Sequence, residues 1–371
     1  MKVLITGING FIGKNLKIRL DELSEFETIG YSRNETYKDL EKKLIDADAV
    51  VHLAGENRPK SDIGFKESNI DLTDELCNLV QKLKKNIPLI FSSSTQASLD
   101  NEYGKSKLTS EKRVIDLSEH QKSYVFIYRL PGVFGKWCKP NYNSVVATFC
   151  NNIANGLPVK INDPDHMIKL VYIDDVISSF ISNLRQYKSL DNHIHKPKIN
   201  PEYTISINEL YETICLFRDS RINLITERVG EGFVRALYST YLTYLPKKSF
   251  SYPLKKNIDN RGIFVEMLKT HDSGQFSFFT AYPGITRGGH YHHSKNEKFL
   301  VLKGEAEFKF RHLISNEVYK LKTSDKDLLI VETIPGWVHD ITNVGNNEMI
   351  VMLWANEIFD PNKPDTIASE I

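Results

Sequence analysis

The chain has 371 residues, of which 41% are hydrophobic and 26% are charged, and its formal net charge at pH 7 is +1. This composition excludes an intrinsically disordered protein, and the balanced charge excludes a protein drawn to nucleic acid or to an anionic membrane by its overall field. The length suggests two domains, since compact domains average about 150 residues.

Short apolar runs alternate with longer amphipathic stretches in the first half of the chain. Residues 2–6, 49–54 and 87–91 are predicted strands, because each run is too short for a helix and is followed by turn-forming or polar residues. Residues 71–85 repeat apolar side chains at helical spacing and end in lysines, which predicts a helix. This alternation is typical of a parallel sheet covered by helices, so we expect an α/β, Rossmann-like domain over residues 1–248.

The pattern changes past about residue 250, where short alternating strands replace the long helical periods. A Pro- and Lys-rich stretch at residues 246–256 separates the two patterns. We expect an all-β domain over residues 249–371, built as a small antiparallel barrel or sandwich. The clearest predicted strands are residues 276–282, 298–304, 306–313, 328–336 and 349–357.

The cysteines and the apolar runs indicate the compartment. The chain has 4 cysteines and no CxxC pair, which argues against a disulfide framework and against a thiolate zinc site. No apolar run reaches the length of about 18 residues that a membrane span needs, and the apolar start lacks a small-residue cleavage site. We therefore expect a cytoplasmic protein with no nucleic-acid or membrane partner.

Three glycines follow the first predicted strand directly, in the sequence TGINGFIG. A pyrophosphate site needs a tight turn, close approach of the backbone and unshielded N–H groups at a helix start, and glycine permits all three. The spacing GxxGxxG resembles that of the extended short-chain dehydrogenase/reductases, and ADAVVHLAG resembles their cofactor-flanking strand. The resemblance implies a dinucleotide cofactor bound by Gly7, Gly10, Phe11, Ile12, Gly13, Leu53 and Ala54.

A phenol and an ammonium lie four residues apart at Tyr103 and Lys107, on one face of a predicted helix. Lys107 can lower the pKa of the phenol and hold the cofactor ribose, while Tyr103 donates a proton to the oxygen of a carbonyl under reduction. Upstream, Ser94 in FSSST matches the hydroxyl with which the same family polarises the substrate carbonyl. We expect these three residues to be catalytic in the first domain.

The expected cofactor is NADPH rather than NADH. The end of the second strand, IGYSRN, presents Arg33 and no acid, and a guanidinium can pair with a 2′-phosphate; a solvated surface arginine is the alternative. The segment RLPGVFG at residues 129–135 resembles a conserved segment of the same family but has Pro-Gly where asparagine is usual. The candidates for substrate contact, unless they form only a solvated charged loop, are Arg129, Lys136, Lys139 and Asn141.

The second domain contains the pattern G-x5-H-x-H-x4-E-x6-G, followed by H-x3-N. Two imidazoles at i and i+2 on a strand project to the same side, and a carboxylate and a third imidazole on neighbouring strands can complete a metal site. The motifs resemble those of the cupins, whose fold is a double-stranded β-helix. We expect a divalent metal, and the ligand set favours zinc over nickel, iron or manganese. The expected ligands are His290, His292, Glu297 and His339, and His293 is an alternative to His292.

Two segments also resemble the cupin 3,5-epimerases of dTDP-4-keto-6-deoxy sugars, namely DNRGIFVE at residues 259–266 and RGGHY at residues 287–291. This resemblance implies epimerisation beside a ketone, with Lys298 as the residue that stabilises the enolate. A ketone acidifies the neighbouring C–H bond, so epimerisation and later hydride delivery to the same ketone form two consecutive steps.

The whole chain resembles the capsular and O-antigen nucleotide-sugar reductases on the route to UDP-N-acetyl-L-fucosamine, including residues 134–150 and 292–301. The resemblance implies a homodimeric, bifunctional enzyme. Its cupin would epimerise C3 of a UDP-2-acetamido-2,6-dideoxy-4-hexulose, and its first domain would use NADPH to form UDP-2-acetamido-2,6-dideoxy-L-talose. Three alternatives stay open: a purely structural or dimerising cupin, a dehydratase or 4-epimerase that keeps NAD bound, and a dinucleotide sensor with a dead site.

Overall fold

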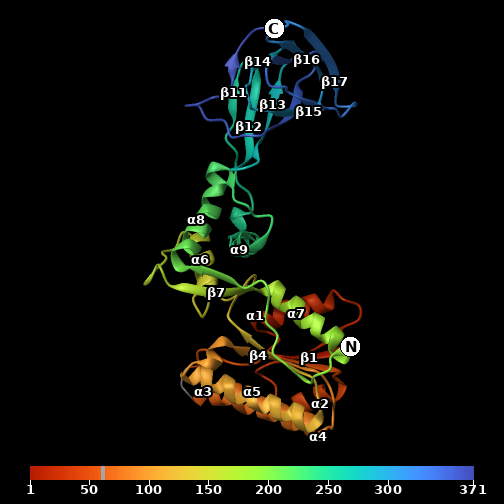
Figure 1. Cartoon of the computed structure of the whole chain (residues 1–371), viewed down its shortest axis with the longest axis vertical. Coiled ribbons are helices and arrows are strands. Elements are labelled where there is room, and N and C mark those ends of the chain that lie inside the picture. The colour runs from red at the N-terminus through yellow and green to blue at the C-terminus, as the bar shows by residue number, and fades with distance from the viewer. Residues whose placement is uncertain (60–62) are drawn as a thin grey trace. The chain divides into compact units, whose positions relative to one another are not determined.

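The computed structural model describes residues 1–59 and 63–371 (Figure 1). Its internal contacts divide the chain into two compact units. The first unit contains Met1–Ile214 and Ala236–Leu245, and the second contains Cys215–Arg235 and Pro246–Ile371. The sequence-based boundary after residue 248 stays a prediction.

The first unit contains a parallel sheet with the strand order β2-β1-β3-β4-β5-β8. These strands are β1 (Lys2–Thr6), β2 (Glu27–Tyr31), β3 (Ala49–His52), β4 (Leu89–Ser94), β5 (Val125–Leu130) and β8 (Ile194–His195). The three strands expected here are all present, although the second ends earlier and the third begins and ends later than the apolar runs suggested.

Helices cover both faces of this sheet (Figure 1). Side chains of α1 (Phe11–Asp21) and α7 (Ile173–Gln186) share one apolar core with one face of the strands. Side chains of α2 (Tyr37–Asp46), α4 (Leu72–Lys82) and α5 (Glu102–Gln121) share the other core. Because the sheet is buried on both faces, its strands are continuous apolar runs, and this confirms the Rossmann-like fold.

Smaller elements complete the first unit. The helix expected over residues 71–85 is α4, which is preceded by a π-helical turn. Strands β6, β7 and β9 form a separate three-stranded sheet. The remaining elements are α3 (Ile63–Phe65), η1 (Lys66–Asp71), η2 (Thr95–Ser98), β6 (Gly132–Phe134), α6 (Val145–Ala154), β7 (Met167–Tyr172), η3 (Tyr187–Ser189) and β9 (Tyr203–Ser206).

The strands of the second unit form two sheets, which confirms the all-β fold class expected for the second domain. One sheet has the order β10-β12-β13-β20-β15-β18, with β11 paired to β12, and the other has the order β17-β16-β19-β14-β21. The apolar core includes Phe279, Phe299, Phe308 and Val351. Its strands are β10 (Ile225–Thr226), β11 (Asn257–Asp259), β12 (Gly262–Thr270), β13 (Gly274–Ala281), β14 (Thr286–Tyr291), β15 (Glu297–Lys303), β16 (Glu305–His312), β17 (Val318–Ser324), β18 (Ile330–Glu332), β19 (Trp337–Asn343), β20 (Met349–Ala355) and β21 (Ile367–Ala368).

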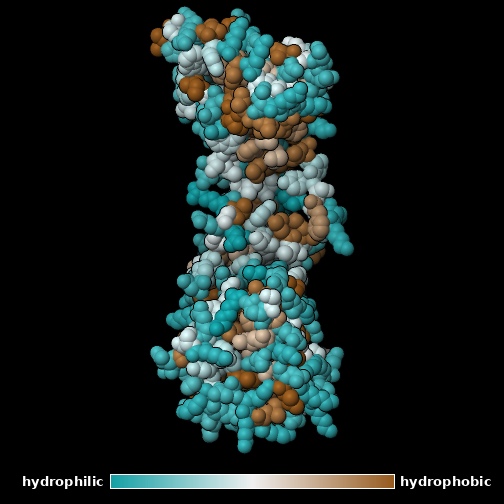
Figure 2. Space-filling view, turned by 90° about the vertical axis from the view of Figure 1, so that its right-hand side faces the viewer, coloured by the Kyte–Doolittle hydropathy of each residue, from teal (hydrophilic) through white to brown (hydrophobic). Residues whose placement is uncertain are grey.

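Three further helical elements lie near the junction of the two units along the chain, namely α8 (Ile207–Asn223), α9 (Gly232–Leu242) and η4 (Lys247–Ser249). Over residues 1–59 and 63–371, none of the helices combines the length and the apolar character that a bilayer crossing requires. Figure 2 shows hydrophilic side chains over much of the visible face, with apolar side chains gathered in patches. Exposed apolar residues of the second unit include Ile258, Ile314 and Ile330.

Candidate functional site

The turn between β1 and α1 has the geometry that a bound pyrophosphate requires. Gly7 adopts a φ of 70°, and a Cβ atom there would lie 2.8 Å from the backbone nitrogen of Ala54. A Cβ atom on Gly13 would lie 2.4 Å from the carbonyl oxygen of Gly7. Gly10 is the N-cap of α1 and offers no side-chain cap, so the first N–H groups of the helix stay available to an anion.

A cavity of about 800 Å³ opens beside this turn and is lined by Gly7, Gly10, Leu53, Ala54 and the chain after β2. Arg33 lies in that lining, where its side chain is 79% exposed and its Nη2 atom is 3.8 Å from Oε1 of Glu56. This weak ion pair leaves the guanidinium able to turn toward a phosphate at the end of β2.

A second cavity, of about 830 Å³, contains two of the predicted reductase residues and shares Gly7, Gly10 and Leu53 with the first. Ser94 at the end of β4 and Tyr103 in the first turn of α5 both line it. Burial raises the pKa of Tyr103, and a hydrogen bond with Ser94 offsets part of this rise. The phenol is therefore protonated at neutral pH and can act as a proton donor.

Lys107 lies one helical turn after Tyr103 and is buried. Its Nζ atom donates a hydrogen bond to the carbonyl oxygen of Ser92 at 2.9 Å. Burial lowers the pKa of Lys107 to about 8, although the nearby Glu111 acts in the opposite direction. Ser94, Tyr103 and Lys107 thus lie together at the carboxyl edge of the parallel sheet, where ligands bind in folds of this kind.

Buried polar residues hold the loop after β3 beside Lys107. Asn69 accepts a hydrogen bond from the backbone nitrogen of Glu56 at 2.8 Å and donates to Ser106 at 2.9 Å. His52 lies between the hydroxyls of Thr6 and Thr73, at 2.6 and 2.9 Å. Burial lowers the pKa of His52 to about 3, so this imidazole is neutral and serves the architecture of the site.

Of the predicted substrate residues, Lys139 lines the second cavity, whereas Arg129, Lys136 and Asn141 do not. Arg129 donates to both carboxylate oxygens of the buried Glu111, at 2.9 and 2.7 Å. Lys136 pairs with Asp174 at 2.7 Å. Arg129 is therefore held by a buried carboxylate and Lys136 pairs with an exposed one, and the spacing of the sequence shows neither partner.

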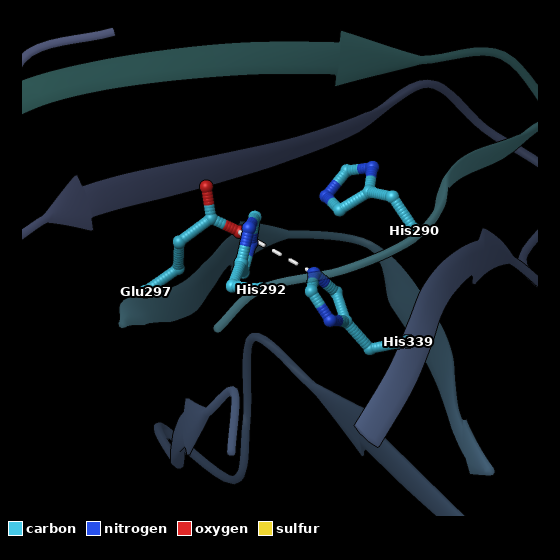
Figure 3. A group of neighbouring side chains, drawn as sticks. All are labelled: His290, His292, Glu297 and His339. Carbon is cyan, nitrogen blue, oxygen red and sulfur yellow. Dashed lines mark ion pairs between the residues drawn. The ribbon is translucent and has the colours of Figure 1, made fainter. Parts of the chain in front are cut away.

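The second unit gathers the four predicted metal ligands into one group (Figure 3). One ligand atom from each of His290, His292, Glu297 and His339 lies within 4.8 Å of the others. His290 on β14 lies opposite His339 on β19, and Glu297 begins β15. The Nε2 atoms of His292 and His339 are 3.3 and 3.4 Å from Oε2 of Glu297.

Buried imidazole nitrogens test whether this group fits a metal. Nε2 of His292 and both ring nitrogens of His339 are buried without a hydrogen-bond partner among the residues that the structure describes. The Nδ1 atom of His292 contacts the carbonyl oxygen of Asp365 at 2.5 Å, so Nδ1 carries the proton and Nε2 presents its lone pair to the group. Orphaned nitrogens beside a carboxylate are the donor set of a divalent transition metal, and the residues present therefore fit one.

Glu297 is ionised within this group. Burial alone would raise its pKa, but contacts with His292, His339 and Lys295 outweigh burial and hold the pKa well below its usual value. Lys295 is itself buried, and its Nζ atom is 2.9 Å from the second carboxylate oxygen of Glu297. The carboxylate of Asp365 accepts hydrogen bonds from the backbone nitrogens of residues 293, 294 and 295, which fixes the turn that carries Lys295.

The position expected for Lys298 needs a correction. Successive side chains on a strand point to opposite faces, so Lys298 points away from the face that Glu297 shares with the histidines. Its Nζ atom pairs with Glu332 at 2.6 Å, and its side chain is 45% exposed. Lys298 therefore does not reach the group, and the buried Lys295 is the lysine beside it. His293, the alternative ligand, is exposed.

The comparisons with known proteins cover both units. Residues 3–196 match the family described as NAD dependent epimerase/dehydratase, and residues 257–367 match the polysaccharide biosynthesis C-terminal domain. A curated relative, the UDP-2-acetamido-2,6-beta-L-arabino-hexul-4-ose reductase of Pseudomonas aeruginosa, is 51% identical and covers 100% of this chain and 99% of its own. Its name describes a reductase of a UDP-linked hexulose.

Solved structures are similar over the whole chain or over its first part. The capsular polysaccharide assembling protein CapF from Staphylococcus aureus has a TM-score of 0.91, 38% identity and full coverage of both chains. The UDP-glucuronic acid 4-epimerase of Bacillus cereus has a TM-score of 0.56 and 18% identity, and it covers 68% of this chain and 100% of its own. At that identity the second likeness shows the fold alone.

The glycine turn and the group of Ser94, Tyr103 and Lys107 are typical of a nicotinamide-dependent oxidoreductase, to which an all-β domain with a group of potential metal ligands is joined. The chain belongs to the NAD dependent epimerase/dehydratase family, and over its whole length to the two-domain reductases that the Pseudomonas aeruginosa enzyme represents.

Proposed function

We propose that this enzyme converts a UDP-2-acetamido-2,6-dideoxy-4-hexulose in two steps during capsule or O-antigen sugar biosynthesis. The second unit epimerises C3, and the first unit then reduces the C4 ketone with NADPH to give UDP-2-acetamido-2,6-dideoxy-L-talose. The observation that carries the proposal is that Ser94 and Tyr103 line, together with the glycine turn, one cavity of about 830 Å³, with the buried Lys107 one helical turn after Tyr103. The names of the relatives support the sugar and the capsule.

In the reduction, bound NADPH supplies a hydride to C4, and the residues of the first unit position the ketone and supply the proton. Ser94 donates a hydrogen bond that orients the carbonyl oxygen, and Tyr103 transfers its proton to that oxygen as negative charge develops. Lys107, whose pKa is lowered to about 8 by burial, binds the cofactor ribose and stabilises the phenolate that remains.

In the epimerisation, a divalent metal held by His290, His292, Glu297 and His339 would polarise the sugar carbonyl and acidify the proton on C3. The imidazole-rich ligand set favours zinc. Asp365 holds the tautomer of His292 through its carbonyl group. Lys295 balances the charge of Glu297 on the side that faces away from the histidines.

The experiment that tests this proposal follows both steps in D₂O. The purified protein is incubated with the UDP-4-keto-6-deoxy amino sugar, with and without NADPH, while NMR follows deuterium at C3 and absorbance at 340 nm follows NADPH. We expect deuterium at C3 without NADPH and oxidation of NADPH when it is added. Oxidation of NADPH without deuterium exchange would show that the second unit is purely structural or dimerising. If neither oxidation nor exchange occurs, the proposed substrate is refuted.

The preference for NADPH depends on Arg33. We expect Arg33→Ala to raise the KM for NADPH by about tenfold or more, because a charge-assisted contact with the 2′-phosphate is lost, while the KM for NADH changes little. Steady-state kinetics with both cofactors measure this. Arg19→Ala is the matched control, since Arg19 pairs with Glu22 on the surface of α1. Equal effects on both cofactors would assign the preference to another residue.

We also propose that the enzyme is a homodimer in the cytoplasm. The dimer rests on the resemblance of the whole chain to the capsular reductases. The compartment is supported by Cys77, Cys138, Cys150 and Cys215, all of which are free thiols.

A further inference from the structure

The loop after β6 presents an aromatic side chain to the second cavity from a strained backbone position. Trp137 adopts a φ of 69°, in the left-handed region that bulky residues rarely occupy. Its side chain is 45% exposed and lines the same cavity as Tyr103. A large indole that is both strained and only half covered by the protein indicates a role outside the packing of the fold.

Contacts on both sides of Trp137 hold the backbone in this conformation. The Nδ2 atom of Asn15 donates to the carbonyl oxygen of Lys136 at 3.2 Å. The hydroxyl of Tyr244 donates to the carbonyl oxygen of Cys138 at 2.6 Å. The residue before Trp137 is therefore held by α1, and the residue after it is held by the segment that follows α9. The direction of the indole is thus fixed before any ligand binds.

A cation and a second aromatic ring from the same loop also line the cavity. The Nζ atom of Lys139 is 5.3 Å from the ring centroid of Tyr142, and both residues line the cavity. Among the residues that the structure describes, no carboxylate lies within ion-pair distance of Lys139, whereas Lys136 is paired with Asp174. The loop thus uses one lysine for its own structure and leaves the other for the cavity.

The residues that line the cavity fall into two chemical kinds. The glycine turn and the start of α1 suit the phosphates of the cofactor. Trp137, Lys139 and Tyr142 offer flat aromatic rings and a cation, which suit a planar base that is followed by a negatively charged diphosphate. Ser94 and Tyr103 also line this cavity, where the sugar carbonyl must lie.

We propose that this loop is the binding site for the UDP part of the substrate. The indole of Trp137 packs against the uracil ring, and the ammonium of Lys139 contacts the diphosphate. This inference rests on the proposed function, because it assigns one end of the same substrate.

Tryptophan fluorescence tests the inference directly. The chain has 3 tryptophans, so the double variant Trp337→Phe and Trp354→Phe leaves Trp137 as the only one. We expect UDP to quench the fluorescence of this variant with a saturable dependence, and NADP⁺ to leave it nearly unchanged. Quenching by NADP⁺ and not by UDP would assign the indole to the cofactor and overturn the inference, as would no response to UDP.

Kinetics of single variants give an independent measurement in the otherwise unaltered chain. We expect Trp137→Ala to raise the KM for the UDP-sugar and the inhibition constant of UDP by about tenfold or more, since stacking on a base is lost, while kcat changes little. Trp137→Phe should restore most of the affinity. An unchanged KM in Trp137→Ala, with normal turnover by the wild type, would overturn the inference and leave the proposed function intact. Quenching by UDP without turnover of the UDP-sugar would support the inference and contradict the proposed function.

Discussion

Replacing Tyr103 with phenylalanine is expected to lower kcat for reduction of the C4 ketone by about 10²- to 10⁴-fold, the range over which general acid catalysis contributes. The aromatic ring and its packing stay in place, but the carbonyl oxygen loses its proton donor and its hydrogen bond. Ser94 can still orient the ketone, so a small residual rate should remain. Oxidation of NADPH at 340 nm with the epimerised substrate measures the effect.

The same variant separates the two reactions of the enzyme. Deuterium exchange at C3 should continue at the wild-type rate, because the metal group belongs to the second unit. Tyr187→Phe is the matched control, since Tyr187 belongs to the first unit but lines neither cavity. A Tyr103→Phe enzyme that retained more than about a tenth of the reduction rate would show that another group supplies the proton.

Replacing His339 with alanine is expected to remove the bound metal and abolish exchange at C3. Residues that only hydrogen-bond to metal ligands contribute about 10- to 100-fold to the affinity for the metal. The loss of a ligand itself should lower the affinity by more than this. Elemental analysis of the dialysed protein and NMR in D₂O measure the two effects. Reduction of an epimerised substrate should persist, because the residues of the reductase site lie in the first unit.

Lys298→Ala is the control for this experiment. Lys298 lies outside the metal group and pairs with Glu332, so its loss should leave the metal content and the exchange rate unchanged. Persistent exchange in His339→Ala would mean that epimerisation does not need the metal. Loss of exchange in Lys298→Ala would mean that Lys298 stabilises the enolate, as the resemblance to the epimerases implies.

Local patterns in the sequence were sufficient where a site follows from spacing along one or two elements. The pair of Tyr103 and Lys107 and the neighbouring ligands His290 and His292 are of this kind, because strand and helix periods fix which side chains share a face. The α/β and all-β fold classes followed from the same periods. The order of the strands in each sheet was not predicted, because it depends on contacts between distant segments.

Two side chains lie away from the positions expected for them, for identifiable physical reasons. The resemblance implies that Lys298 stabilises the enolate, but the two-residue period of β15 turns it outward, whereas Lys295 lies in a turn where that period does not apply. Arg129 was expected at the substrate, yet its partner Glu111 lies on another element and no local pattern announces the pair. Long-range partners of this kind become visible only when the chain is folded.

The contacts of Asp365 with the metal group have a consequence for the synthesis of the enzyme. This residue supports His292 and the turn that follows it, and β21 then pairs with the ligand-bearing strand β14. Domains generally fold in the order in which the ribosome releases them. The first unit is complete at Leu245, whereas the metal ligands need Asp365, which lies about 120 residues further along the chain. A nascent chain interrupted between these points would carry a finished reductase and an unfinished metal group.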